Sequence, residues 1–146
     1  MIFRKILIAV DSSAASMKAA RAGFELAHGL KAMVGIISVV DKGKEVVNAD
    51  LGITPEESRA ALLEEAENMI AQFIKMYEGI AKVFRFTPEG IPEKEILRIV
   101  TEWQADLIVM GTHGRSGLSR MLTGSVAEYV IRHAEVPVMV IPSGVK

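Results

Sequence analysis

Apolar residues along the chain gather into short continuous runs, separated by longer segments in which they recur every three or four positions. A continuous apolar run is typical of a parallel strand that is covered on both faces. The runs predict five strands, at Phe3–Val10, Met33–Val40, Ile80–Phe86, Leu107–Met110 and Val136–Ile141. The segments between the runs have the spacing of one helix face, so the chain is expected to alternate strand and helix.

Local signals mark the ends of the first two predicted helices. The apolar face of the first carries Met17, Ala20, Phe24 and Ala27. We expect Gly29 to end this helix, because glycine readily takes the left-handed conformation of a helix C-terminus. The second begins with Thr54-Pro55-Glu56-Glu57, a capping box with proline at the first helical position, and Gly79 is expected to end it. Its apolar stripe is expected to be core: Leu62, Ala66, Met69, Phe73 and Tyr77.

The third helix is expected to begin at Pro92 and to bring Trp103 into the core or its margin, and the fourth covers Val126–Arg132. Asp41–Thr54 has no periodic pattern and predicts a loop, and Thr87–Gly90 predicts a turn. Strands alternating with helices indicate an α/β fold, a doubly wound five-stranded parallel sheet with helices on both faces. At 146 residues, the chain is expected to form a single domain, residues 1–146.

A glycine-spaced stretch, Gly111 to Ser125, connects the fourth strand to the fourth helix. The carboxyl ends of strands are where α/β sheets place their ligands. Gly124-Ser125 at the helix start offers free N–H groups and a hydroxyl, which suit an anion such as phosphate. The stretch fits neither a Walker A loop nor a dinucleotide fingerprint. Its spacing is Gly, two residues, Gly, nine residues, Gly-Ser.

This spacing, with its flanking strand and helix, resembles the signature of the ATP-binding branch of the universal stress protein family. The resemblance extends from the first strand, which ends at Asp11, to the last strand, after Pro137. It implies the strand order 3-2-1-4-5, with the loops after strands one and four facing each other across one crevice. It also implies that the chain binds ATP, with Mg²⁺ carried by the phosphates.

The resemblance identifies the positions that would touch the nucleotide. Those matching the nucleoside contacts are Ala9, Asp11 and Val39. Those matching the contacts from the glycine stretch are Met110, Gly111, His113, Gly114, Gly124, Ser125 and Val126. Two interpretations of Asp11 stay open, a ligand of Mg²⁺ or the nucleotide and a helix N-cap. Arg115 and Arg120 are either phosphate ligands or solvated loop charges.

The sequence contains no constellation that predicts fast chemistry. The crevice has His113 as its histidine, no paired carboxylates at useful spacing and no lysine in the glycine stretch. We therefore expect a regulatory nucleotide-binding protein of the stress response rather than an enzyme, acting through an unknown downstream protein partner. The alternatives are a slow ATPase or nucleotide-handling enzyme, and a dimeric scaffold whose site stays empty.

The composition of the chain excludes several classes of partner and site. The net charge of −1, from 17 basic and 18 acidic residues, gives no electrostatic case for nucleic acid or an anionic membrane. The absence of cysteine excludes disulfides and thiolate metal sites. No apolar run approaches the ~20 residues of a membrane span, and the first residues lack the order of a signal peptide. We expect a cytoplasmic protein.

The last strand predicts a homodimer. Val136–Ile141 carries no charge, although the implied strand order places it at a sheet edge, where exposed strands are normally protected. Pro137 blocks one hydrogen-bond donor, but the rest of the run is apolar. Two copies that pair this strand antiparallel about a two-fold axis would bury both edges. The family resemblance implies a dimer through the same element.

Overall fold

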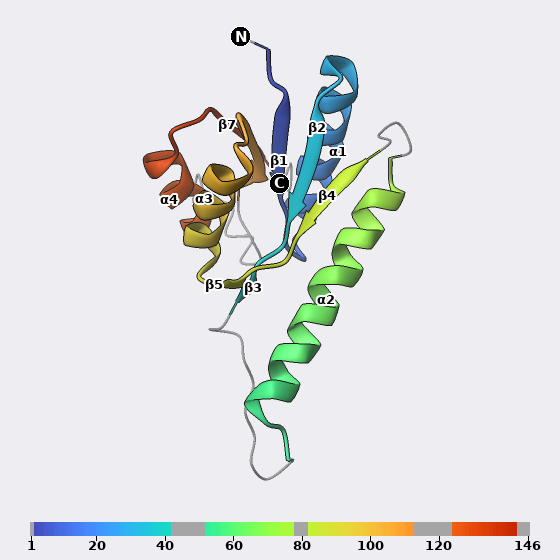
Figure 1. Ribbon diagram of the computed structural model, residues 1–146, viewed down its shortest axis with the longest axis vertical. Coiled ribbons are helices and arrows are strands. Elements are labelled where there is room, and N and C mark those ends of the chain that lie inside the picture. Colours follow the sequence, from blue (N-terminus) through green and yellow to red (C-terminus); the bar gives the residue numbers. More distant parts are fainter. Residues whose placement is uncertain (1, 42–51, 78–81, 113–123, 143–146) are drawn as a thin grey trace.

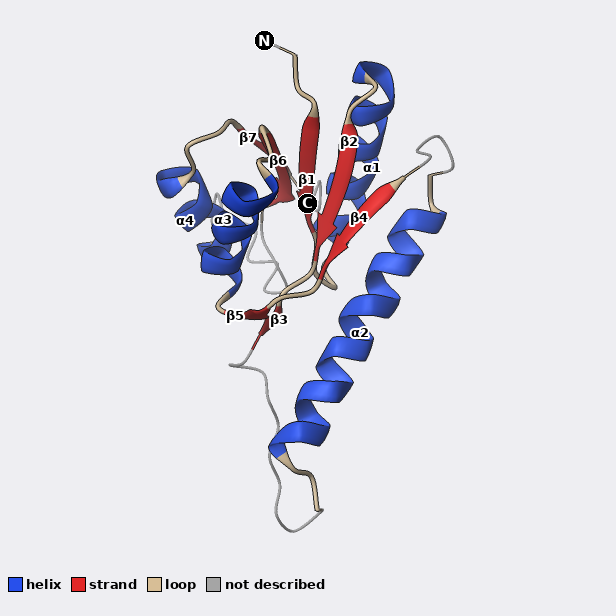
Figure 2. Cartoon of the chain, in the orientation of Figure 1, coloured by secondary structure: helices blue, strands red, loops and turns tan. Residues whose placement is uncertain are grey.

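The computed structural model describes residues 2–41, 52–77, 82–112 and 124–142. Its elements follow the alternation that the apolar pattern predicts (Figures 1 and 2). They are β1 (Lys5–Ala9), α1 (Ala14–Leu30), β2 (Met33–Ile37), β3 (Val40–Asp41), α2 (Pro55–Lys75), β4 (Val83–Phe86), β5 (Glu89–Gly90), α3 (Pro92–Trp103), β6 (Leu107–Gly111), α4 (Ser125–His133) and β7 (Val138–Ile141).

Five parallel strands form the main sheet in the order β4-β2-β1-β6-β7. Counted among these strands alone, this is the expected order 3-2-1-4-5. The register places Ile6 opposite Val34 on one side and Leu107 on the other, which centres β1 in the sheet. The last strand, β7, lies at an edge as expected, although it begins at Val138 rather than Val136.

Successive residues of β1 face opposite sides of the sheet, and each side has its own core. Ile6 and Ile8 pack with Phe24 of α1 and Ile70 of α2. The other face is covered by α3 and α4, where Leu7 belongs to the core cluster that also contains the residues Ile96, Ile99, Ala127 and Val130. Figure 1 shows the two helix layers on either side of the sheet. The fold class predicted from the sequence is confirmed.

The apolar face of α1 differs from the prediction at one position. Met17 is 53% exposed, whereas Phe24 is fully buried. The buried face is centred on the row that includes Ser16, Ala20 and Gly23, so Met17 lies at its margin in a helix of 3.6 residues per turn. The small residues of this row let the helix approach the sheet closely.

The end of α1 also differs from the prediction. The helix does not end at Gly29 but runs through Leu30. Lys31 adopts the left-handed conformation, with φ of 56°, and its N–H donates to the carbonyls of Ala27 and His28. The C-terminal hydrogen bonds that a glycine usually supplies are therefore made by a lysine two positions later.

The start of α2 is the capping box that the sequence predicts. The N–H of Glu57 donates to Thr54 Oγ1 at 3.1 Å, and the N–H of Thr54 donates to Glu57 Oε2 at 3.5 Å. The helix ends at Lys75, and Gly79, its predicted end, lies outside the described residues. Figure 1 shows the N-terminal half of α2 extending past the carboxyl ends of the strands.

The second predicted strand divides into two. β2 ends at Ile37, and Val40 and Asp41 form β3, which pairs in parallel with β5 as a separate two-stranded sheet. The predicted turn at Thr87–Gly90 is therefore wrong in its second half, where Glu89 and Gly90 are strand. The N–H of Val40 donates to Pro88 O at 2.8 Å, a partner that lies beyond β4 and draws the chain away from the main sheet.

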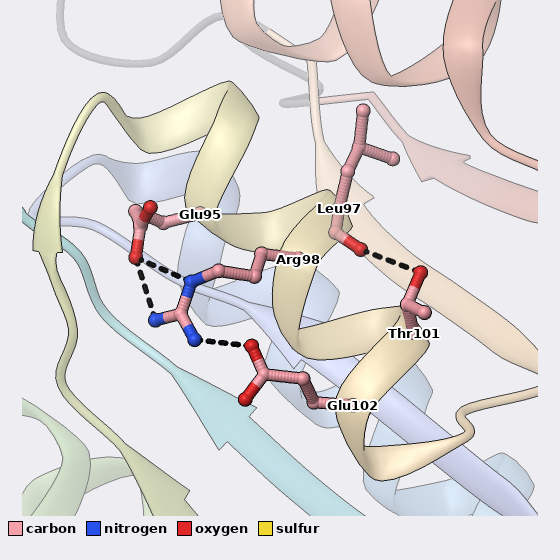
Figure 3. A network of polar contacts seen from close by, with 5 residues as sticks. All are labelled: Glu95, Leu97, Arg98, Thr101 and Glu102. Carbon is pink, nitrogen blue, oxygen red and sulfur yellow. Dashed lines mark hydrogen bonds and ion pairs between the residues drawn. The ribbon is translucent and has the colours of Figure 1, made fainter.

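Ion pairs cover the outer face of α3 (Figure 3). The guanidinium of Arg98 donates to Glu95 from Nε at 3.0 Å and from Nη2 at 2.7 Å, and its Nη1 donates to Glu102. These hydrogen bonds, that with Glu95 first, raise the pKa of Arg98 above its usual value. The three side chains are exposed or partly so and lie one helical turn apart, so they reinforce the helix by little.

Polar groups at the amino end of the sheet bind one another. The carboxylate of Asp106 accepts from the N–H groups of Arg4 at 2.9 Å and Lys5 at 3.1 Å. Lys5 Nζ donates to Trp103 O at 3.1 Å and lies 5.5 Å from the centre of the indole ring. Trp103 is half-buried, as expected, and its ring packs against Phe84 and Phe86.

Candidate functional site

A cavity of about 410 Å³ lies at the carboxyl ends of the strands. Its wall includes the ends of β1 and β6, the chain from β2 into β3, the first turn of α4 and parts of α2 and α3. This is the position where open α/β sheets bind ligands, and the volume lies within the common range for small-molecule sites.

Every predicted contact residue that the structure describes lies in the wall of this cavity. They are Ala9, Asp11, Val39, Met110, Gly111, Gly124, Ser125 and Val126. The two remaining predictions, His113 and Gly114, lie outside the described residues, as do Arg115 and Arg120. Segments that are over 100 residues apart in the sequence thus meet at one site, as expected from the strand order.

Asp11 is held by two hydrogen bonds but is not a helix cap. Its Oδ1 accepts from the N–H of Ser13 at 2.8 Å and from Ser16 Oγ at 2.9 Å. The N-cap of α1 is Ser13, so Asp11 forms an Asx turn just before the helix, and the predicted cap role is wrong. Oδ2 accepts no hydrogen bond from the residues that the structure describes, which leaves it available to a ligand or a cation.

The start of α4 leaves backbone donors free of any side-chain cap. Gly124 is the N-cap, and no described side chain accepts from the first N–H groups of the helix. Such groups, with the helix dipole, favour an anion. Gly124 has extended backbone, with φ of −70° and ψ of 163°, and its own N–H donates to Thr112 O at 2.7 Å. Gly124 and Ser125 thus open the helix as the sequence predicts.

Gly111 lets the end of β6 approach the first turn of α1. A Cβ at this position would lie 2.7 Å from Ala15 Cβ and 3.0 Å from the carbonyl carbon of Ala15. Backbone atoms cannot move aside easily, so a larger residue would push the strand and helix apart. The absence of a side chain at Gly111 therefore keeps β6 and α1 close together beside the cavity.

Similarity to known proteins identifies the family of this chain. The model of the universal stress protein family matches residues 2–142. The chain belongs to this family. A curated relative, universal stress protein MJ0531 of Methanocaldococcus jannaschii, is 38% identical over 146 aligned residues, which cover 96% of this chain and 82% of the relative.

Solved structures agree. The universal stress protein UspA of Lactobacillus plantarum has a TM-score of 0.82 and 27% identity, covering 97% of this chain and 99% of that chain. The structure of protein MJ0577 of Methanocaldococcus jannaschii has a TM-score of 0.82 and 29% identity, covering 97% of both. Two universal stress proteins solved in complex with cAMP and with dAMP share the fold, at TM-scores of 0.66 and 0.64 and identities of 21% and 22%.

The sequence interpretation missed part of the wall of this universal stress protein. Leu62, Ala66 and Met69 of α2 line the cavity, although the sequence suggests plain core. Their spacing places these three residues on one face of α2. Because α2 extends past the carboxyl ends of the strands, this part of the face lines the cavity. The helical spacing was visible in the sequence, but the length by which α2 overhangs the sheet was not.

The charged groups of the wall are acidic. Among the described residues, the cavity is lined by Asp11, Asp41 and Glu65 and by no lysine, arginine or histidine. No three His, Cys, Asp or Glu side chains of the described residues gather in a way that could hold a metal ion without a ligand. No helix in the described part of the chain has the length and apolar character needed to cross a bilayer.

Proposed function

We propose that this universal stress protein binds ATP in the cavity and acts as a regulatory nucleotide-binding protein of the stress response. The observation that carries the proposal is that the uncapped N-terminus of α4 opens into the same cavity as an apolar wall. One part suits phosphate and the other suits a flat aromatic base. A nucleotide is the common small molecule that combines these two groups.

The two parts indicate how the ligand would lie. The phosphates would accept hydrogen bonds from the N–H groups at Ser125 and Val126. His113 and Gly114 remain proposed contacts of the nucleotide. Ala9, Val39 and Met110 would supply apolar contacts to the nucleoside. Other universal stress proteins have been solved with cAMP and dAMP, but these share the fold alone with this chain. The cavity itself therefore supports the proposal.

We further propose that ATP binds with Mg²⁺. The carboxylate of Asp11 in the wall would repel bare phosphates. A divalent cation removes this conflict, and carboxylate oxygen is the kind of ligand that Mg²⁺ takes in nucleotide sites. Asp11, whose Oδ2 accepts no hydrogen bond from the described residues, would hold the cation directly or through water.

We also propose that two copies pair through β7. This strand is the sheet edge beside β6, and Met139 on it is 36% exposed. An uncharged, open edge strand recruits a second chain. Val138→Asp and Val140→Asp, made singly, should each shift the protein toward monomer in sedimentation velocity at tens of micromolar. A wild type that is already monomeric there, or a dimer unchanged in both variants, would rule out this pairing.

Calorimetry tests the ATP proposal. Gly124→Val should lower the affinity for Mg²⁺-ATP at least tenfold, about 1.4 kcal/mol, because a branched side chain would stand where phosphate meets the backbone. Valine adopts the extended conformation of Gly124 readily, so the fold should be kept.

The matched control is Gly29→Val. A Cβ at Gly29 meets no heavy atom within 4 Å, and this position lies at the other end of α1 from the cavity. This variant should bind ATP like the wild type. Equal affinity in wild type and Gly124→Val would disprove the assignment of phosphate to the start of α4, and no measurable ATP binding by the wild type would disprove the function.

A further inference from the structure

One buried serine holds Asp11 at two points. Ser16, in the first turn of α1, is 3% exposed. Its Oγ accepts from the N–H of Asp11 at 2.8 Å and donates to Asp11 Oδ1 at 2.9 Å. An N–H group can only donate and an ionised carboxylate can only accept, so the direction of both hydrogen bonds is fixed. Ser16 therefore ties the backbone of Asp11 to its side chain.

The two oxygens of the Asp11 carboxylate differ as a result. Oδ1 accepts from Ser16 Oγ and, at 2.8 Å, from the N–H of Ser13. A carboxylate oxygen offers about two lone-pair sites, so these two donors occupy both sites of Oδ1. Oδ2 accepts no hydrogen bond from the described residues. Asp11 therefore has one oxygen, Oδ2, to offer to a ligand in the cavity that it lines.

The turn before α1 does not require the hydroxyl of Ser16. The hydrogen bond from the Ser13 N–H to Oδ1 is enough to form an Asx turn. The bond from Ser16 adds the occupation of the second site on Oδ1 and a fixed orientation of the carboxylate. Ser16 supplies it from the wall of the cavity, beside the ligand.

We propose that Ser16 is a positioning residue that restricts Asp11 to binding the cation of the nucleotide through one oxygen, and that it thereby favours Mg²⁺ over Ca²⁺. This inference rests on the proposed function. Mg²⁺ demands near-octahedral geometry, which the narrow bite of a bidentate carboxylate would distort. Ca²⁺ takes about six to eight oxygens in a flexible shell and accepts carboxylates in the bidentate mode. A carboxylate with one oxygen already occupied suits Mg²⁺ better.

Titrations with different cations test the role of the Ser16 hydroxyl. Ser16→Ala frees one site on Oδ1 and leaves the charge of Asp11 in place. Each protein is titrated with ATP in Mg²⁺, in Ca²⁺ and in a chelator, and is melted without nucleotide. The decisive quantity is the ratio of the ATP affinity in Mg²⁺ to that in Ca²⁺. Ser58→Ala is the matched control, because Ser58 is also a buried helical serine, 8% exposed on α2, and does not line the cavity.

The wild type should bind ATP more tightly in Mg²⁺ than in Ca²⁺, and Ser16→Ala should lower this ratio about fivefold. Loss of a group that orients a metal ligand often has a larger effect, but here the phosphates also hold the cation. The affinity in the chelator should stay within about twofold, and Ser58→Ala should keep the wild-type ratio. Adding Ser16→Ala to Asp11→Asn should change the ratio no further, because Ser16 acts through the carboxylate.

Several results would overturn the inference. They are a wild type that binds ATP equally in Mg²⁺ and Ca²⁺, a ratio unchanged in Ser16→Ala, and a fall in the ratio that persists when Asp11 is already asparagine. A loss of affinity that is equal in all three solutions would show that Ser16 only holds the turn. Should Ser16→Ala fail to fold, Ser16→Cys has similar size and a much weaker donor, and its ratio decides in the same way.

The failure of this inference differs from the failure of the proposed function. ATP binding that does not depend on the cation would overturn the role of Ser16 and leave the nucleotide site standing. A wild type that binds no ATP in any of the three solutions would show that the proposed function itself is wrong.

Discussion

At the amino end of the sheet, Asp106 accepts from two backbone N–H groups, and Lys5 donates to the carbonyl of Trp103. At the carboxyl end, the hydroxyl of Thr112 has no partner among the described residues, and α4 begins without a side-chain cap. The described polar groups at the amino end bind one another. At the carboxyl end some do so, as Asp11 does with Ser13 and Ser16, whereas the first N–H groups of α4 have no side-chain acceptor among the described residues.

The two ends of the sheet thus use their polar groups differently, one for stability and the other for binding. Satisfied groups at the amino end stabilise the folded state and have no capacity left for a ligand. Open groups at the carboxyl end destabilise the empty protein, and a ligand that pairs with them would bind more tightly for that reason. Substitutions at the amino end should therefore change stability alone, and substitutions at the carboxyl end should mainly change binding.

The largest effect is expected for Trp103→Ala at the amino end. The indole packs against Phe84 and Phe86 with ring centres 5.6 Å apart in each pair, and losing it should lower the free energy of unfolding by about 3 kcal/mol. Urea unfolding measures this loss. The affinity of the folded variant for ATP should stay within twofold of the wild type.

Met17→Ala is the control for Trp103→Ala. It also removes a large apolar side chain, but one that is 53% exposed, so its cost should be within about 0.5 kcal/mol. If Trp103→Ala stays folded but no longer binds ATP, the proposed division between the two ends is wrong, because the same residue would then serve both stability and binding.

The next effect is expected for Ser125→Asp at the carboxyl end. A carboxylate in the first turn of α4 would repel phosphate and weaken ATP binding about tenfold, or 1.4 kcal/mol. The same carboxylate interacts favourably with the helix dipole, so the melting temperature without nucleotide should hold or rise. Calorimetry and thermal melting measure the two opposite changes. Ser125→Asn has similar size without the charge, and an equal loss of affinity there would point to crowding instead of repulsion.

The smallest effect is expected for Asp11→Asn. Asparagine can accept the same two hydrogen bonds through Oδ1, so the turn before α1 should be kept. Removing the charge should weaken ATP binding about fivefold, or 1 kcal/mol, with Mg²⁺ present, and should not weaken it without metal. Titrations with Mg²⁺ and with a chelator measure this. Ser16→Ala, which loses a hydrogen bond to Asp11 but keeps the carboxylate, should retain the metal dependence, and identical metal dependence in Asp11→Asn would exclude a metal role.

Much of the fold could be predicted because each element carries its own signal. The apolar run of β1 and the capping box of α2 depend on neighbours in the sequence, and both are confirmed. The strand order came from the resemblance to a family, since periodicity contains no information about which strands are adjacent. The predicted end of α1 at Gly29 was wrong because Lys31, not a glycine, adopts the left-handed conformation that ends the helix.

The rest depended on contacts between distant segments. The chain leaves β2 after Ile37 because Val40 finds a partner beyond β4, at Pro88, and nothing in the run Met33–Val40 signals this. The same limit applies to the site. Glycine spacing indicated the start of α4, but only the structure shows that the hydroxyl of Thr112 has no partner among the described residues. An unmet hydrogen bond has no signature in a sequence.

The hydrogen bond between Thr112 O and Gly124 N–H, 2.7 Å long, joins two residues with eleven others between them in the chain. The N–H of Thr112 also donates to Ile141 O, so Thr112 and Gly124 are held by hydrogen bonds that do not involve the residues between them. In evolutionary terms, β6 and α4 keep their places through contacts between described residues, so substitutions in the sequence between Thr112 and Gly124 need not disturb them. Lineages that carry this framework could therefore acquire new ligands by altering one short stretch, with the cost to folding already limited by the anchor at its base.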